Sequence, residues 1–100
     1  MKNNPIVCNL TESELRGKRE EISGIIKSHV REIRDLDSGL AFRFDANDVI
    51  FDILSCFIQN ERKCCTHFRF KIIVEPNAGP VWLEITGDRA KDFLRAELGL

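Results

Sequence analysis

Hydrophobic residues in the first half of the chain are spaced first as in a helix and then as in a strand. Residues 11–28 carry apolar side chains at helical intervals, and Thr11 with Glu14 form a potential capping box at their start. Residues 30–36 are ambiguous, because Val30, Ile33 and Leu36 have a helical period. An Asp-Ser-Gly turn signal nevertheless separates them from residues 40–44, which alternate clearly as a strand. The pattern predicts a helix followed by a β-hairpin.

The second half repeats this order and adds one more helix. Apolar residues at helical spacing predict a helix from about residue 45 to 64. Alternation at 68–74 and at 81–86, on either side of a Pro- and Gly-rich loop, predicts a second hairpin. A last helix is expected at about 88–98. We expect residues 68–74 to form a strand with one buried face.

The predicted element order is α-β-β-α-β-β-α, which belongs to the α+β class. The simplest architecture is a four-stranded, mostly antiparallel sheet with the helices on one face. Side-chain parity also predicts the register of the second hairpin. The inward pairs are Val74 with Val81, Ile72 with Leu83 and Phe70 with Ile85, and the outward pairs are Ile73 with Trp82 and Lys71 with Glu84.

Length and composition indicate one globular domain over residues 1–100. Of the 100 residues, 43% are hydrophobic and 31% are charged, so the chain has enough apolar surface to fold. The net charge of −1 comes without a basic face, which argues against nucleic-acid binding. No apolar run is long enough for a membrane span or a signal peptide, so we expect a cytoplasmic protein without a membrane partner.

The densest group of reactive side chains is the segment that ends the second predicted helix. Cys64 and Cys65 are adjacent there, and His67 follows two residues later. In a reducing compartment, cysteines are expected to be thiols that are buried, metal-binding or redox-active. Two thiolates at a chain bend favour soft ions such as Hg(II), Cd(II) or Cu(I), with His67 as a third ligand. Zinc is a weaker candidate because its cysteines are usually two to four residues apart.

Glu61 and Cys64 continue the apolar stripe of this helix, so both are candidates for burial. A buried carboxylate needs a partner or an opening. Glu61 is therefore either part of a structural ion pair or turned outward, or it stands with Arg62 as a supporting group beside the thiols. Cys8 lies three residues before the Thr11 cap and is a candidate third thiol. Every one of these cysteines has the alternative of simply packing as a small core residue.

Trp82 and Ile73 form the other candidate surface. They are predicted to pair on the outer face of the sheet, where two large apolar groups suggest a contact surface. A homodimer would cover them. The alternative is a tryptophan partly covered by Arg or Lys stems.

Several motifs resemble a group of small, little-characterised bacterial proteins. They are the segments Glu61-Arg62-Lys63-Cys64-Cys65 and Gly79-Pro80-Val81-Trp82-Leu83, together with Cys8-Asn9-Leu10 and Phe68-Arg69-Phe70. A similar Glu-x-x-Cys-Cys segment occurs in the C-terminal parts of some regulators of the MerR type. The resemblance implies a link to heavy-metal or thiol chemistry. The chain departs from the group's pattern at Thr66 and His67, where a proline and an aromatic residue are expected.

These observations leave three hypotheses for function. The first is a soft-metal or thiol-reactive binding module that uses Cys64 and Cys65. The second is an interaction or dimerisation domain whose cysteines are structural. The third is a small enzyme with a cysteine nucleophile, with His67 as its base and Arg62 steering an anionic substrate.

Overall fold

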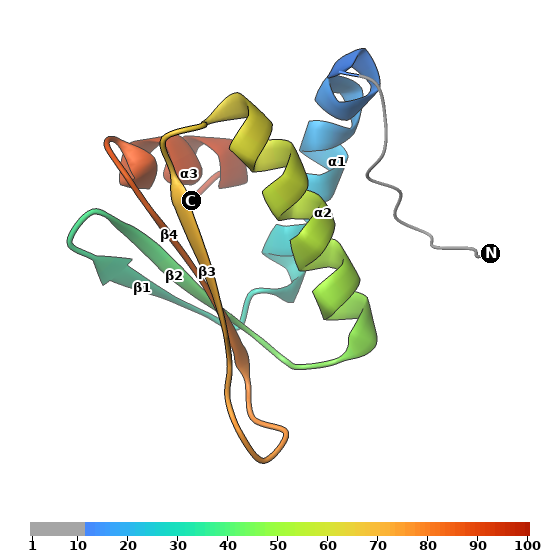
Figure 1. Cartoon of the computed structure of the whole chain (residues 1–100), viewed down its shortest axis with the longest axis vertical. Coiled ribbons are helices and arrows are strands. Elements are labelled where there is room, and N and C mark those ends of the chain that lie inside the picture. Colours follow the sequence, from blue (N-terminus) through green and yellow to red (C-terminus); the bar gives the residue numbers. More distant parts are fainter. Residues whose placement is uncertain (1–11) are drawn as a thin grey trace.

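The computed structural model describes the backbone of residues 12–100 and the side chains from residue 21 onward. The predicted element order is confirmed (Figure 1). The elements are α1 (Glu12–His29), β1 (Glu32–Leu36), β2 (Gly39–Phe44), α2 (Asp48–Cys64), β3 (Arg69–Val74), β4 (Val81–Thr86) and α3 (Ala90–Leu98). The Thr11 cap predicted for α1 lies outside the described residues.

The four strands form one antiparallel sheet in the order β1-β2-β4-β3, with the helices on one face (Figure 1). Each hairpin therefore contributes one central and one edge strand, and β2 and β4 pair along the middle. The predicted register of the second hairpin is confirmed at all five predicted pairs, from Phe70 opposite Ile85 to Val74 opposite Val81.

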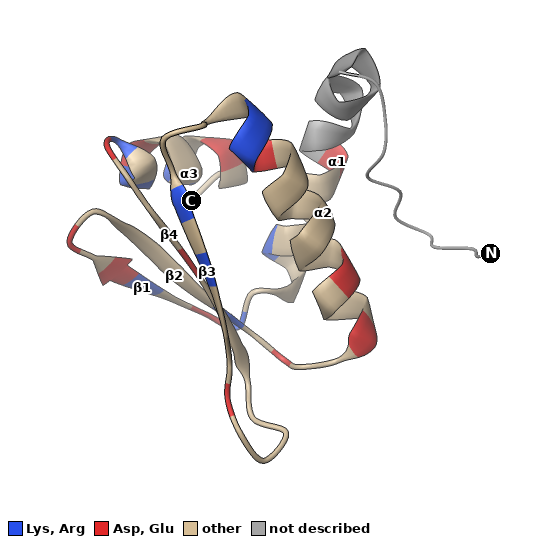
Figure 2. Ribbon diagram, in the orientation of Figure 1, with Lys and Arg blue, Asp and Glu red and all other residues tan. Residues whose placement is uncertain are grey.

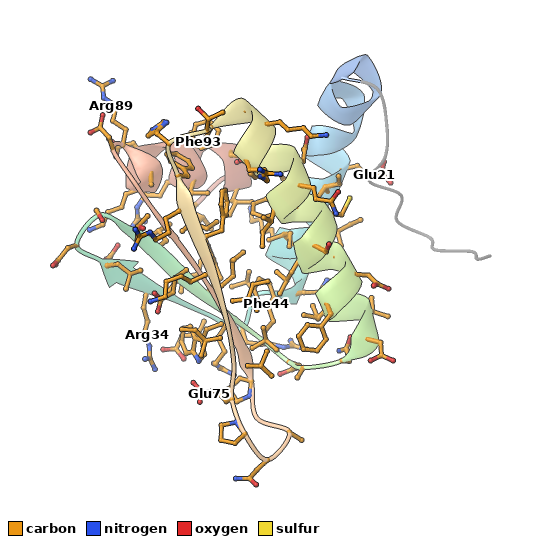
Figure 3. All side chains as sticks on the ribbon, in the orientation of Figure 1. Glu21, Arg34, Phe44, Glu75, Arg89 and Phe93 are labelled. Carbon is orange, nitrogen blue, oxygen red and sulfur yellow. The ribbon has the colours of Figure 1, made fainter. Side chains whose placement is uncertain are left out.

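The core lies between the two central strands and the helices. The helix-facing side chains of β2 and β4 are at most 1% exposed, and Phe44 points into the space between sheet and helices (Figure 3). Helix α1 packs against α2 and α3, and α3 packs on the central strands. The buried apolar residues of the helices complete this core: Ile22, Ile26, Ile50, Ile53, Leu54, Phe57, Ala90, Leu94 and Leu98.

Helix α2 begins and ends at residues whose local hydrogen bonds account for the boundaries. The side chain of Asn47 accepts a hydrogen bond of 2.9 Å from the backbone N–H of Ile50, which is the usual N-cap contact. At the other end, Cys65 leaves the helical conformation, with φ −125° and ψ 77°. Both cysteines of the pair therefore lie where α2 turns toward β3.

The burial expected on one face of β3 is wrong for most of the strand. Ile72 is 44% exposed and Val74 57% exposed, and Phe70 is only partly buried. The physical reason is position: β3 is an edge strand, and the β3–β4 hairpin projects beyond the helices (Figure 1). Alternation predicted the strand and its facing, but not whether a helix would cover that face.

No helix in the described part of the chain is both long and apolar enough to cross a membrane.

Candidate functional site

The cysteine pair occupies two different environments. Cys64 is the last residue of α2 and its side chain is exposed, which corrects the expected place of Cys64 on the buried stripe. Cys65 is the C-cap residue and is only 7% exposed, as part of the apolar core. Both cysteines keep their thiols. The predicted burial of Cys64 is wrong because this residue is the last of the helix and lies beyond the part of α2 that packs on the core.

Two backbone hydrogen bonds hold the turn that contains the pair. The N–H of Cys65 donates to the carbonyl of Glu61 at 2.8 Å, and the N–H of Phe68 donates to the carbonyl of Cys65 at 3.1 Å. The first bond is the last of the helical type, and the second closes a tight turn into β3. The turn lets one sulfur face water while its neighbour packs inside.

His67 is exposed and lies in the turn before β3. Its Nε2 is 3.1 Å from the carbonyl oxygen of Asp88, so the ring is oriented toward the loop before α3. The ring also packs edge-on against Phe68, with centroids 4.7 Å apart. The imidazole is therefore held near the chain bend by contacts that do not involve a thiol.

Glu61 is buried, as its place on the stripe predicts, and is only 1% exposed. Arg62, by contrast, is exposed. The sequence pattern did not identify Asn60 as a buried polar residue of this site. Asn60 is buried next to Glu61, and its amide nitrogen has no hydrogen-bond partner among the described residues. Its position three residues after Phe57, on the inner side of the helix, was the signal that could have found it.

The last turn of α2 is basic, with Arg62 and Lys63 directly before the cysteine pair (Figure 2). The side chains of both residues are exposed, so their charge is largely screened by water and salt. They give the surface around Cys64 a positive character in a chain whose net charge is −1.

Cys56 carries no free thiol that could join this site. Cys56 is completely buried and disulfide-bonded, so the expectation that the cysteines are thiols does not hold there. Cys8, the candidate third thiol, lies outside the described residues. Within the described residues, no three His, Cys, Asp or Glu side chains converge as metal ligands.

A shallow depression lies between the β1–β2 turn and the start of α3, lined by residues 37–38 and 87–92. None of the described cysteines lines it. An enzyme with a cysteine nucleophile would need a substrate pocket next to its thiol, and this depression does not provide one.

The outer-face pair is present and partly covered. Trp82 pairs with Ile73 as predicted, and both side chains are half-buried. The guanidinium of Arg34 lies 4.5 Å from the centroid of the Trp82 ring, a cation–π arrangement that shields the indole. The guanidinium groups of Arg34 and Arg43 both donate hydrogen bonds to the carboxylate of Glu32 and lower its pKa.

In comparisons with known proteins, the chain matches no family model, no curated protein and no solved structure.

Proposed function

We propose that the protein is a small binding module for soft metal ions or thiol-reactive species, with Cys64 as its first contact and Cys65 as its second. The observation that carries the proposal is an exposed thiol at a helix end, covalently next to a second thiol. A thiolate is both the nucleophile and the metal ligand in cysteine chemistry, so a reagent in solution meets Cys64 first.

The second sulfur is close along the chain but is packed inside. Cys65 lies outside the regular helix, at a cap residue, so its backbone is held by turn contacts rather than by a full helical ladder. We expect a local rearrangement of this cap, with loss of these two hydrogen bonds, to bring its sulfur outward. Hg(II) and Cd(II) gain strongly from a second thiolate, which would offset the loss of packing around Cys65.

His67 and Glu61 are proposed in supporting roles. His67 is exposed two residues after the pair and would supply a borderline nitrogen ligand, at the expense of its contact with the Asp88 carbonyl. Glu61 holds the cap through its carbonyl and fixes where the helix ends. The resemblance of the Glu-x-x-Cys-Cys segment to that of metal-responsive regulators agrees with this class of ligand.

Titration with Hg(II) or Cd(II) tests the proposal, with thiolate-to-metal charge-transfer absorption as the signal. We expect one ion per chain to bind, binding to weaken strongly in Cys64→Ser, and the signal to fall in Cys65→Ser. Thr66→Ala is the matched control because it changes the next, exposed residue of the same turn without removing a sulfur. If the Cys64→Ser, Cys65→Ser double variant binds as well as the wild type, the proposal is wrong.

An interaction domain is the second candidate function. The observation that favours it is that Cys65 and Cys56 both pack in the core, as structural cysteines would. The exposed apolar residues of β3 supply a surface for a partner.

A further inference from the structure

Strand β3 is an edge strand whose outer side is not paired in the sheet. Its neighbour is β4, and no other strand of the described chain lies beside it. An edge of this kind exposes backbone N–H and C=O groups that can pair with another strand. The hairpin also extends past the helices, which leaves this edge accessible (Figure 1).

The side chains of β3 make the edge unusually apolar on the helix side. Phe70, Ile72 and Val74 share that face, and Ile72 and Val74 are the more exposed. The opposite edge strand, β1, carries a charged side chain on the same helix-side face, because Asp35 makes an ion pair there with Arg95. Charged side chains are a common defence of edge strands, and the helix-side face of β3 has none.

The backbone groups that face outward can be identified from the hairpin. The N–H of Glu75 donates to the carbonyl of Pro80 at 3.1 Å, so Glu75 faces β4. In an antiparallel strand, the backbone N–H and C=O groups of successive residues point alternately to one neighbouring strand and to the other side. The N–H and C=O groups of Phe70, Ile72 and Val74 therefore face the open edge. The residues with apolar side chains are thus also those with unpaired backbone groups on the open side.

We propose that a second copy of the chain pairs with this edge, β3 antiparallel to β3, around a two-fold axis at Ile72. Ile72 then lies opposite Ile72 of the second copy, and Phe70 lies opposite Val74. These are hydrogen-bonded pairs in an antiparallel ladder, which matches the outward direction of their backbone groups. The interface is isologous, so each contact occurs twice.

Charge complementarity favours this register. On the outer face, it places Arg69 opposite Glu75 of the second copy, and Glu75 opposite Arg69, with both side chains exposed in the single chain. Opposite charges facing each other across an antiparallel pair stabilise it. Glu75 lies near the turn of the projecting hairpin, away from the helices (Figure 3).

The two neighbouring registers of the same symmetry are less favourable. An axis at Lys71 places two lysines directly opposite each other, which is destabilising. An axis at Ile73 places Phe70 opposite Pro76, which has no N–H to donate and whose carbonyl already accepts from Gly79 within the turn. The sequence of this strand is therefore best matched to itself around Ile72.

Sedimentation velocity over a concentration series tests the proposal, with non-reducing electrophoresis of the same samples to exclude disulfide-linked dimers. We expect the wild type to be dimeric and Ile72→Lys to be monomeric. Ile33→Lys is the matched control, because Ile33 is 38% exposed on the same face of the other edge strand. The control variant should remain dimeric, and the far-UV circular dichroism of both variants should match that of the wild type.

A charge exchange tests the register. Arg69→Glu alone, or Glu75→Arg alone, should weaken the dimer by about tenfold or more, since two attractive pairs become repulsive. The double variant should restore the affinity. Arg69 and Glu75 of one chain are about 20 Å apart along the strand, so rescue cannot arise within a single chain.

Three results would overturn the proposal. One is a wild type that stays monomeric at every concentration. Another is a double charge variant that dimerises no better than the single ones. The last is a dimer that survives Ile72→Lys but is lost in Trp82→Ala, which would place the contact on the outer face of the sheet.

Discussion

Individual residues near the bend after α2 differ in ways that decide their chemistry. Cys64 and Cys65 are neighbours in sequence, but one is exposed and the other is part of the core. A reagent therefore meets one thiol at the surface, and the second becomes available only through movement of the cap. The sequence identifies the two adjacent cysteines but does not show which of them is exposed. Their exposure depends on where the packing of α2 on the core ends, which is a property of the tertiary structure.

Glu32 gives a prediction for pH dependence. Hydrogen bonds from Arg34 and Arg43 hold the pKa of its carboxylate below the ordinary value. A carboxylate with a lowered folded-state pKa binds fewer protons than in the unfolded chain, so its contribution to stability is present at neutral pH and is lost as the pH falls through the folded-state pKa. We expect the unfolding free energy of Glu32→Gln to fall less steeply on acidification than that of the wild type. Urea denaturation at a series of pH values measures this. The prediction is contradicted if the unfolding free energies of Glu32→Gln and the wild type fall equally steeply with pH.

At the scale of elements, local pattern and tertiary position contribute separately. Turn signals and alternation predicted all four strands, and side-chain parity predicted the register of β3 against β4. Local sequence patterns did not predict the strand order β1-β2-β4-β3 or the exposure of β3. Both depend on which strands the helices cover, which is set by the tertiary structure. At the candidate site, helical spacing predicted the burial of Glu61 correctly and that of Cys64 wrongly.

Gly39 is the residue on which the close pairing of β2 and β4 depends most clearly. A Cβ at this position would lie 1.8 Å from the backbone oxygen of Ile85, and neither strand can move away without breaking the ladder. We expect Gly39→Ala to lower the free energy of unfolding by about 3 kcal/mol, as overpacking does in a rigid core. Gly24→Ala is the control: a Cβ there meets nothing within 4 Å. That variant should be neutral or slightly stabilised, by up to about 1 kcal/mol, because alanine favours a helix.

Thermal or urea denaturation measures the free energy of unfolding of the two variants. An equal loss of stability in Gly39→Ala and Gly24→Ala would contradict the account.

At the scale of the whole molecule, the two proposed functions occupy different parts of the fold. The thiols lie at the C-terminal end of α2, and the proposed dimer contact lies along the free edge of β3. The chain from the cap leads directly into β3 through the turn at His67. Cys65 therefore lies only four residues before Arg69, the first residue of the proposed interface.

The most direct test of the central claim is X-ray absorption spectroscopy of the Hg(II)-loaded protein, which counts the sulfur atoms around the metal. We predict two sulfur neighbours in the wild type, one in Cys65→Ser and none at a stoichiometric site in the double Cys64→Ser, Cys65→Ser variant. A wild-type spectrum with a single sulfur neighbour, unchanged when Cys65 is replaced, would contradict the account.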